Sequence, residues 1–383
     1  MQKPLRILHA VNVRWFNATA WYGLSLARLQ REAGHEVLVF GLEGTESFAQ
    51  AEAMGLKPEP LPLNTVNPLA VPGLLARMRA ALRSFRPHVV NCHRGEGLIF
   101  WGLLKKGRHP FALVRTRGDQ RPPKGNPANT FLHARVADAV IATNSRTARQ
   151  CRELFGLGPD RLFTVPGGAD TRRFAPDRAA GRAVRQRLGF ADGDCVLGLL
   201  GRFDAVKGQR ELIASLGRLV RCPEAAAFSD RLRLMLMGFA TSLDTASVEA
   251  WLDEAGLAGR AVITGKVDDV AAHINAMDLG VVASQGSEAI ARAAFEIMAC
   301  GVPLVGTDVG VMPDLLAPHA LVPPGGGSAL DCLLLRALGD ASFLRILAEE
   351  QRAAMPRFTQ EAFLRDTLRV YETALARLGL RAP

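Results

Sequence analysis

Residues 278–314 read DLGVVASQGSEAIARAAFEIMACGVPLVGTDVGVMPD, and this stretch decides the fold. Asp278–Ala283 is a short apolar run typical of a buried strand, and polar residues and a glycine then interrupt it. The sequence from Glu288 to Cys300 favours a helix, with Gly301 as its stop and Pro303 opening the next strand. This order of strand, helix and strand is typical of a parallel α/β sheet.

Two carboxylates in this stretch, Glu288 and Glu296, lie about 12 Å apart along a helix that rises ~1.5 Å per residue. They cannot bind one atom, but they could hold two ends of one extended ligand. The residues around Glu296 are apolar on nearly every face, and a buried carboxylate is costly unless it is paired. We interpret Glu296 as a ligand contact, and the alternative is an i,i+4 pair with Arg292. Glu288 should lie in the first helical turn, beside N–H groups that suit a phosphate.

A second motif, GRFDAVKG at residues 201–208, follows the first strand of the second half of the chain. Its two cations, Arg202 and Lys207, flank a predicted helix N-terminus. Cations beside free N–H groups are suited to a leaving diphosphate, because negative charge develops there. The alternative for an isolated pair is two solvated surface charges.

Together these segments resemble the signature of the retaining glycosyltransferases of family 4. In that family a Glu, seven residues and a second Glu precede an apolar-Ala-x-Gly-x-Pro stretch. The corresponding residues here are Glu288, Glu296 and Met298–Pro303. The 201–208 loop resembles the family's Gly-Arg-x-x-x-x-Lys-Gly loop, and the likeness is closest from about residue 162 to 316.

This resemblance implies the α/β fold called GT-B, in which two Rossmann-like domains face each other across a cleft and a C-terminal helix crosses back to the first domain. The predicted boundaries are 1–170 for the acceptor-side domain, 171–194 for a linker with one helix, 195–359 for the nucleotide-sugar-binding domain, and about 360–383 for the returning helix. Strands are predicted at 6–13, 36–41, 88–92, 111–116, 138–142, 162–165, from 195, and at 232–237, 261–264, 279–283, 304–306 and 321–322. Helices are predicted at 21–33, 68–85 and 360–378.

The resemblance also implies a reaction and a donor site. A sugar would pass from a nucleoside-diphosphate sugar to an acceptor hydroxyl with retained anomeric configuration, without a metal or a cofactor. Arg202 and Lys207 would hold the diphosphate, Glu288 the sugar hydroxyls and Glu296 the nucleotide's ribose. The further donor-side residues implied are Gly201, Ala289, Ile290, Ala291 and Asp308.

Polar residues after the strands of the first half are expected at the carboxyl edge of that sheet, where ligands bind. The acceptor-side candidates are Asn17, Thr19, His93, Arg117 and Asp119. Asn17 and Ala18 stand where many relatives have two glycines, and side-chain donors from Asn17 and Thr19 could substitute for the close backbone contact.

Arg117 stands where many relatives of the family have a histidine. Because Arg keeps its proton, Arg117 is no general base, but it can donate hydrogen bonds to a phosphate or a sugar. Asp119 and His93 are candidates for orienting the acceptor, and the alternative is a local ion pair with Arg115 or Arg121.

The charge is concentrated in the first half of this 383-residue chain of net charge +10. Residues 1–170 carry 23 Lys+Arg and 12 Asp+Glu, so all of the excess lies there. This asymmetry predicts an anionic partner, such as a lipopolysaccharide core, a lipid-linked glycan or a membrane surface. Nucleic acid is a weak option, because no nucleic-acid motif or cluster of stacking aromatics accompanies the charge.

Other features bound the location of the protein. The sequence has no run long and apolar enough for a membrane span and no signal peptide at its start, so we expect a cytoplasmic protein. The six cysteines are far apart, which favours free thiols and argues against a zinc site. Residues 74–86 form a basic amphipathic pattern that either contacts an anionic membrane peripherally or packs against the sheet.

Two other functions fit the same sequence. A nucleotide-sugar epimerase of similar fold needs no acceptor and would exchange a proton at a sugar carbon. A non-catalytic partner protein would bind a nucleotide sugar without turning it over, and the departures at Asn17 and Arg117 make that reading plausible.

Overall fold

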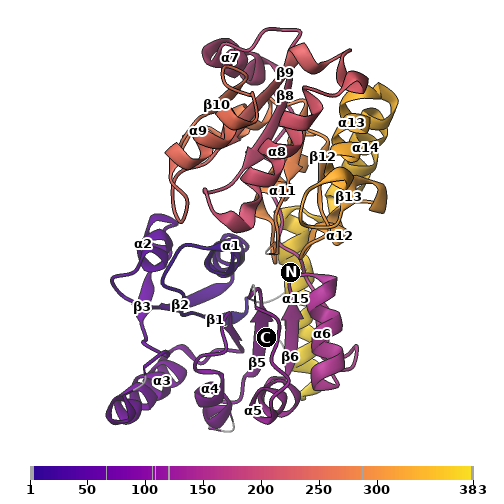
Figure 1. Ribbon diagram of the computed structural model, residues 1–383. Helices are drawn as coiled ribbons and strands as arrows, with labels where there is room; N and C mark the ends of the chain where they lie inside the picture. Colours follow the sequence, from indigo (N-terminus) through magenta and orange to yellow (C-terminus); the bar gives the residue numbers. More distant parts are fainter. Residues whose placement is uncertain are drawn as a thin grey trace. The chain divides into compact units, whose positions relative to one another are not determined.

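The structure is a computed structural model that describes residues 4–380, apart from residues 66, 106, 108, 120 and 287. The chain divides into two compact units (Figure 1). Unit 1 comprises Met1–Gly167 and Gln360–Pro383, and unit 2 comprises Gly168–Thr359. Each unit contains one sheet in which every paired strand is parallel, which confirms the predicted α/β class with two Rossmann-like units.

Unit 1 is built on a seven-stranded sheet in the order β3-β2-β1-β4-β5-β6-β7. Its strands are β1 (Arg6–Val11), β2 (Glu36–Gly41), β3 (Pro58–Pro60), β4 (Val89–Cys92), β5 (Ala112–Arg117), β6 (Ala139–Ala142) and β7 (Leu162–Thr164). Its helices are α1 (Ala18–Glu32), α2 (Glu46–Ala53), α3 (Val71–Phe85), α4 (Leu98–Leu104), α5 (Pro127–Phe131), α6 (Ser145–Phe155) and α15 (Gln360–Arg377), with short turns η1 (Pro68–Ala70) and η2 (Leu132–Val136).

The sequence located these strands to within two residues, except for β3. That edge strand is three residues long with a proline at each end, so it carries no strand pattern. Helix α1 begins three residues before its predicted start, because the Asn17 side chain caps it by accepting from the Thr19 and Ala20 backbone N–H groups.

The two faces of the unit 1 sheet bury different residues of each strand. On β1, Leu8 and Ala10 face the core formed with α3 and α4, whereas Val11 faces α1. The C-terminal helix α15, yellow in Figure 1, packs against β5, β6 and α1. Tyr371 of α15 accepts a 2.7 Å hydrogen bond from Asn91 of β4. The C-terminal helix is therefore an integral part of unit 1.

Helix α3 contains the basic amphipathic segment predicted at residues 74–86, for which membrane contact and packing against the sheet were left open. Its apolar residues Leu74, Met78 and Leu82 are buried in the core beneath the sheet. The predicted packing role is therefore confirmed, and this apolar face is occupied by the protein itself. Among the described residues, no helix has both the length and the apolar character needed to cross a bilayer.

Unit 2 is built on a six-stranded sheet in the order β10-β9-β8-β11-β12-β13. Its strands are β8 (Cys195–Leu200), β9 (Leu232–Met237), β10 (Ala261–Ile263), β11 (Leu279–Val282), β12 (Leu304–Thr307) and β13 (Leu321–Val322). Its main helices are α7 (Arg178–Leu188), α8 (Gln209–Leu219), α9 (Thr245–Glu254), α10 (Val270–Ile274), α11 (Arg292–Ala299), α12 (Met312–Leu315), α13 (Ser328–Gly339) and α14 (Ala341–Ala354). Short turns are η3 (Ala205–Lys207), η4 (Pro223–Ala225), η5 (Ser229–Arg231), η6 (Pro318–Ala320) and η7 (Met355–Arg357).

The segment predicted as a linker, residues 171–194, lies within unit 2. Its helix α7 packs against α10, and Gly181 lies so close that a Cβ there would be 2.1 Å from the Asn275 carbonyl oxygen. Arg185 also forms a 2.6 Å ion pair with Asp278 at the start of β11. Local composition marked this stretch as polar, but packing makes it part of the unit.

The helix predicted from Glu288 to Cys300 begins only at Arg292, so the expectation that Glu288 lies in its first turn is wrong. Glu288 lies in the loop between β11 and α11. Bonds to distant segments hold this loop: the Gln285 N–H donates to the Val206 carbonyl, and the Glu288 carbonyl accepts from the Val311 N–H, both at 2.8 Å. These tertiary bonds override the local helix preference.

Candidate functional site

Two of the sequence motifs meet at the carboxyl edge of the unit 2 sheet. The strand order reverses between β8 and β11, and doubly wound sheets bind ligands at such a point. The 201–208 loop follows β8, and the loop containing Glu288 follows β11. Gly208 lets the two loops touch: its φ is 74°, and a Cβ there would lie 1.9 Å from the Ala283 carbonyl oxygen.

Lys207 and Glu288 form an ion pair at this point, with 2.5 Å between Nζ and Oε1. The Ser284 hydroxyl donates to the same carboxylate oxygen, also at 2.5 Å. The Glu288 side chain is only 9% exposed. The structure therefore brings together two of the three predicted catalytic residues in one nearly buried ion pair.

A third loop, after β12, completes this edge. Gly310 has a φ of 55°, and a Cβ there would lie 2.0 Å from the Glu288 carbonyl oxygen, so only glycine fits. Asp308, a predicted donor-side residue, follows β12 directly, and its backbone N–H donates to the Val322 carbonyl at 2.7 Å. Three loops from adjacent strands thus surround Glu288.

Arg202, the third predicted catalytic residue, extends from the same loop as Lys207. Its guanidinium lies 3.1 Å from Asp204 in an ion pair, and 40% of its side chain is exposed. The neighbouring Gly201 lies under the Lys207 side chain, whose Cδ would be 3.6 Å from a Cβ at that position. Asp204 is thus a local partner of Arg202, and an anionic ligand would compete with Asp204 for this guanidinium.

Glu296 lies in the buried helix α11, as the sequence predicted, and is 7% exposed. The ion pair with Arg292 that was its alternative explanation is present, with 2.7 Å between Nε and Oε1. Burial raises the pKa of Glu296 above its ordinary value, although Arg292 and then Arg173 act in the opposite direction. The pair therefore does not compensate fully for burial of this carboxylate.

The three residues after Glu288, which were predicted on the donor side, form the rest of the loop before α11. Ile290 is fully buried, and Ala291 has a φ of 46°. A left-handed conformation costs about 1 kcal/mol in a residue with a Cβ, and such strain concentrates at functional sites. The side chains of Ala289, Ile290 and Ala291 offer no polar atoms, so only their backbone groups can bind a polar ligand.

In unit 1 the strand order reverses between β1 and β4, and the predicted residues Asn17 and Thr19 follow β1. The Asn17 side-chain oxygen is used in capping α1. The Thr19 hydroxyl donates to the Gly118 carbonyl at 2.9 Å, which holds the segment after β5 beside the start of α1. Thr19 is therefore a positioning residue rather than the free donor that the sequence suggested.

His93 follows β4 and is fully buried beside a second histidine, His9 of β1. Nε2 of His93 lies 2.9 Å from Nδ1 of His9, whose other ring nitrogen lies 2.7 Å from Gln30. Burial, and then the neighbouring His9 and Arg115, lower the pKa of His93 well below its usual value, and burial lowers the pKa of His9 to about 4. Both imidazoles are thus neutral at physiological pH. Nδ1 of His93 has no hydrogen-bond partner among the described residues.

Asp119 lies among arginines at the ends of β4 and β5. Arg115 forms the local ion pair that was its alternative role, at 2.7 Å, and Arg117 lies 3.8 Å from the same oxygen. Burial alone would raise the pKa of Asp119, but Arg115, Arg117 and Arg94 outweigh it and hold the pKa below its usual value. The guanidinium of Arg115 is almost fully buried. This edge of unit 1 therefore carries a cationic cluster of Arg94, Arg115 and Arg117 around Asp119, and Arg94 is also paired with the Glu96 carboxylate at 2.6 Å.

Three residues of these sites were not among the predicted site residues. Ser284 contacts Glu288, Arg94 adds a cation near Asp119, and Gly310 sets the close approach of two loops. A polar residue directly after a buried strand, as Ser284 is, was an available signal. Arg94, two residues after β4, carried the same signal, but its contacts depend on which strands are neighbours.

Within the part of the chain that the structure describes, no group of three or more His, Cys, Asp or Glu side chains has the arrangement of a metal site. All six cysteines are free thiols, and Cys92, Cys151 and Cys300 are buried.

Comparison with known proteins identifies the family. The sequence model described as "Glycosyl transferases group 1" matches residues 194–340, and the one described as "Glycosyltransferase Family 4" matches residues 20–173. Together the two matched segments cover most of the chain.

Two relatives are named D-inositol 3-phosphate glycosyltransferase. The protein from Xylanimonas cellulosilytica is 27% identical over 402 residues, covering 94% of this chain and 92% of its own. The protein from Geodermatophilus obscurus is 32% identical over 212 residues, covering 53% of this chain. This match spans about half (46%) of the Geodermatophilus protein.

Among solved structures, Anabaena HepE in complex with UDP has a TM-score of 0.81 at 20% identity, covering 96% of this chain and 99% of that one. This likeness establishes a shared GT-B fold. With both family models matched in the order that the fold requires, the chain belongs to the family 4 glycosyltransferases of group 1.

Proposed function

We propose that this protein transfers a sugar from a nucleoside-diphosphate sugar to an acceptor hydroxyl, with retention of the anomeric configuration. The observation that carries this proposal is the meeting of Lys207, Glu288 and the 308–310 loop at the strand-order reversal of unit 2. That arrangement offers cations, a carboxylate and backbone groups together at one sheet edge.

Each donor-side residue has a role that its surroundings support. Lys207 and Arg202 bind the diphosphate and stabilise the charge that develops as it leaves. Glu288, held by Lys207 and Ser284, accepts hydrogen bonds from sugar hydroxyls. Glu296 accepts hydrogen bonds from the ribose, which offsets the cost of its burial.

The chemical step needs no protein nucleophile. The acceptor oxygen bonds to the anomeric carbon on the face that the diphosphate leaves, the carbon–oxygen bond to the diphosphate breaks, and the acceptor proton passes to the departing diphosphate. Cationic side chains supply the charge stabilisation, so transfer is expected to continue in the presence of a chelator. The anomeric configuration of the product, measured by proton NMR, tests retention.

The donor is testable by ligand-induced stabilisation. We expect one nucleotide among UDP, GDP, ADP and TDP, and its sugars, to raise the unfolding temperature; at a hundred times its dissociation constant the gain is about 2.7 kcal/mol. UDP is the first choice, because the fold neighbour HepE binds it. Thermal unfolding across the panel, followed by turnover with the best donor, is the measurement.

Three outcomes contradict the proposal. Stabilisation by none of the nucleotides removes the donor site. Proton exchange at a sugar carbon without any acceptor indicates an epimerase. Binding without turnover across phosphorylated and neutral acceptors indicates a non-catalytic partner protein.

For the acceptor we propose an anionic compound, with a phosphate bound by the cationic cluster of unit 1. Burial and the charge of Arg115 lower the pKa of Arg117, so an anion there would relieve repulsion between the two arginines. The relatives named D-inositol 3-phosphate glycosyltransferase favour a phosphorylated polyol. An envelope glycan or a lipopolysaccharide core would be a larger acceptor of the same charge, and each is a narrower form of this proposal. We also propose a cytoplasmic location.

Arg117→Gln is expected to raise KM for a phosphorylated acceptor about tenfold and to leave donor binding unchanged, because one charged hydrogen bond is lost. The measurement is initial rate against acceptor concentration, with the dephosphorylated acceptor alongside. Arg79→Gln, an exposed arginine of α3 in the same unit, is the control. Equal activity of wild type on both forms of the acceptor would contradict the anionic acceptor.

A further inference from the structure

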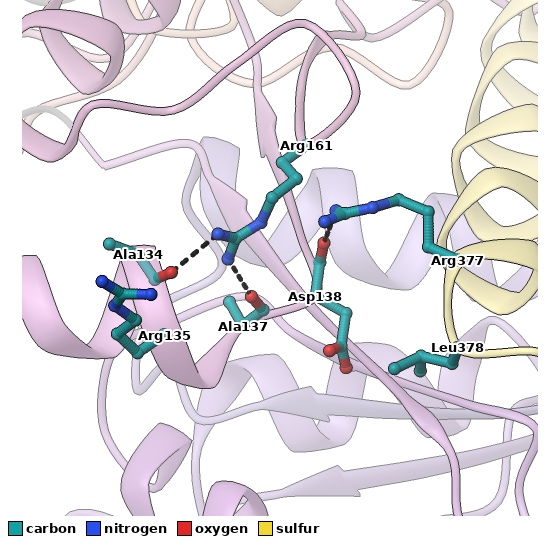
Figure 2. A pocket seen from close by; sticks show the side chains of 7 residues that line it. All are labelled: Ala134, Arg135, Ala137, Asp138, Arg161, Arg377 and Leu378. Atoms are coloured by element: carbon teal, nitrogen blue, oxygen red, sulfur yellow. Dashed lines mark hydrogen bonds between the residues drawn. The ribbon is translucent and has the colours of Figure 1, made fainter.

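Unit 1 contains a polar cavity that plays no part in the proposed transfer. It has a volume of about 250 Å³ and lies at the amino ends of β6 and β7, whereas Arg117 lies at the carboxyl end of β5. Figure 2 shows three arginines around it, Arg135 from η2, Arg161 before β7 and Arg377 from the end of α15. The cavity is thus on the opposite edge of the sheet from the acceptor-side residues.

The three arginines differ in how firmly the protein holds them. Arg161 donates to three carbonyl groups, at 2.6 Å to Ala134, 2.5 Å to Ala137 and 3.2 Å to His133. These bonds satisfy backbone carbonyl groups at the end of η2 and fix the guanidinium in place (Figure 2). Arg161 is therefore a preorganised wall of the cavity.

Arg377 joins the C-terminal helix to this cavity. Its guanidinium donates to the Asp138 carbonyl at 3.1 Å and lies 3.2 Å from the carboxylate of Asp160, an exposed residue. Arg135 is exposed, and no described residue forms an ion pair or side-chain hydrogen bond with it. Two of the three arginines thus have N–H groups available to a ligand.

The carboxylates nearby do not neutralise this charge. The Asp138 carboxylate is bound by Lys105 at 2.6 Å and by the Leu113 N–H at 2.8 Å. Three arginines and one carboxylate, Asp138, line the cavity, so cations exceed carboxylates there by two. Burial and then the charge of Arg377 lower the pKa of Arg161, although Asp138 and Asp160 act in the opposite direction.

We infer that this cavity of unit 1 is a binding site for a phosphate monoester, held by Arg135, Arg161 and Arg377. A phosphate monoester carries about 1.5 to 2 negative charges at pH 7, which matches the excess of two cations. Planar guanidinium groups bind its oxygens in pairs. The volume is below the roughly 300–1,000 Å³ of sites for drug-sized ligands, so the occupant is a small compound or a head group.

A bound phosphate would also fasten α15 to the rest of unit 1. Arg377 is the last residue of that helix. Arg135 precedes β6, and Arg161 precedes β7. One anion shared by all three would replace repulsion with attraction across these segments. The site therefore has a regulatory or stabilising role rather than a role in the chemical step.

The experiment uses the full chain and two probes of the same chemistry, glucose 6-phosphate in solution and phosphatidate in lipid vesicles. Affinity for glucose 6-phosphate is measured by calorimetry, and vesicle binding by sedimentation. Arg135→Gln and Arg377→Gln are each expected to weaken binding about tenfold or more, because each removes a charged hydrogen bond. Neither variant disturbs the carbonyl bonds of Arg161, so both should fold.

Matched variants assign the binding to this cavity. Arg79→Gln removes an exposed arginine elsewhere in unit 1 and should bind like wild type. Weaker binding of either probe in both cavity variants supports the inference, and the probe affected identifies a soluble or a lipid source. A loss confined to Arg117→Gln or Lys207→Ala places the phosphate in the transfer site and overturns the inference. Binding by neither probe also overturns it, while leaving the donor panel unaffected.

Discussion

Lys207→Ala is expected to lower the rate of sugar transfer by about 10²–10³-fold, the usual cost of removing one donor that stabilises developing negative charge. In the structure Lys207 is the cation in contact with Glu288, with 2.5 Å between them. Loss of Lys207 therefore removes the proposed diphosphate contact, while the Ser284 hydroxyl still donates a hydrogen bond to the Glu288 carboxylate. The measurement is kcat and KM with the donor found in the nucleotide panel.

A second variant separates loss of chemistry from loss of folding. Because Glu288 is nearly buried, Lys207→Ala should also destabilise unit 2, by about 2 kcal/mol. Adding Glu288→Gln removes the unpaired charge, so the double variant should recover stability but not turnover. Arg218→Ala, which breaks a half-exposed 2.6 Å pair with Asp331 elsewhere in unit 2, should keep full activity. Full activity of Lys207→Ala would remove Lys207 from the mechanism.

Glu296→Gln is expected to weaken donor binding about 10- to 100-fold while making the protein more stable at neutral pH. The affinity falls because a charged acceptor of hydrogen bonds is lost at the ribose. The stability rises because burial of the ionised carboxylate, reflected in the raised pKa of Glu296, is no longer required. Donor affinity and unfolding temperature, measured on the same preparation, should move in opposite directions.

The raised pKa of Glu296 also fixes how this residue's contribution to folding stability changes with pH. The folded protein holds the Glu296 proton to a higher pH than the unfolded chain does. The stabilising contribution of this proton is therefore complete below the unfolded-state pKa and is lost as pH rises through the folded-state pKa. Glu296→Gln should remove this part of the stability curve between acidic and neutral pH.

Asp331 provides the control of opposite sign for Glu296. Burial alone would raise the pKa of Asp331, but hydrogen bonds from Arg218 and Ser215 hold it below its usual value. Asp331→Asn should thus lower stability at neutral pH and leave donor binding unchanged. If Glu296→Gln unfolds at a lower temperature than wild type at pH 7, the role of the Glu296 carboxylate is its ion pair with Arg292 and not a contact with the ligand.

Much of the fold could be predicted, because strands and helices leave periodic patterns in the chain. The strands of unit 2 lie within a residue of their predicted positions, and α15 ends one residue before its predicted end. The two motifs that we propose bind the donor were also visible, since each is contiguous in the sequence. The main error was the start of α11, where hydrogen bonds from the Val206 and Val311 segments hold the chain in a loop.

By itself the sequence determined the α/β alternation, the family, and the residue types at the sheet edges, because each depends on short stretches of neighbouring residues. Only the tertiary structure decided that Lys207 pairs with Glu288, 81 residues away, and that Arg115 is buried beside Asp119. The arginine cavity, with Arg377 more than 200 residues from Arg161, likewise exists only in the folded unit. The physical reason is that these contacts follow from which strands are neighbours in a sheet, and that order is set by packing of the whole unit.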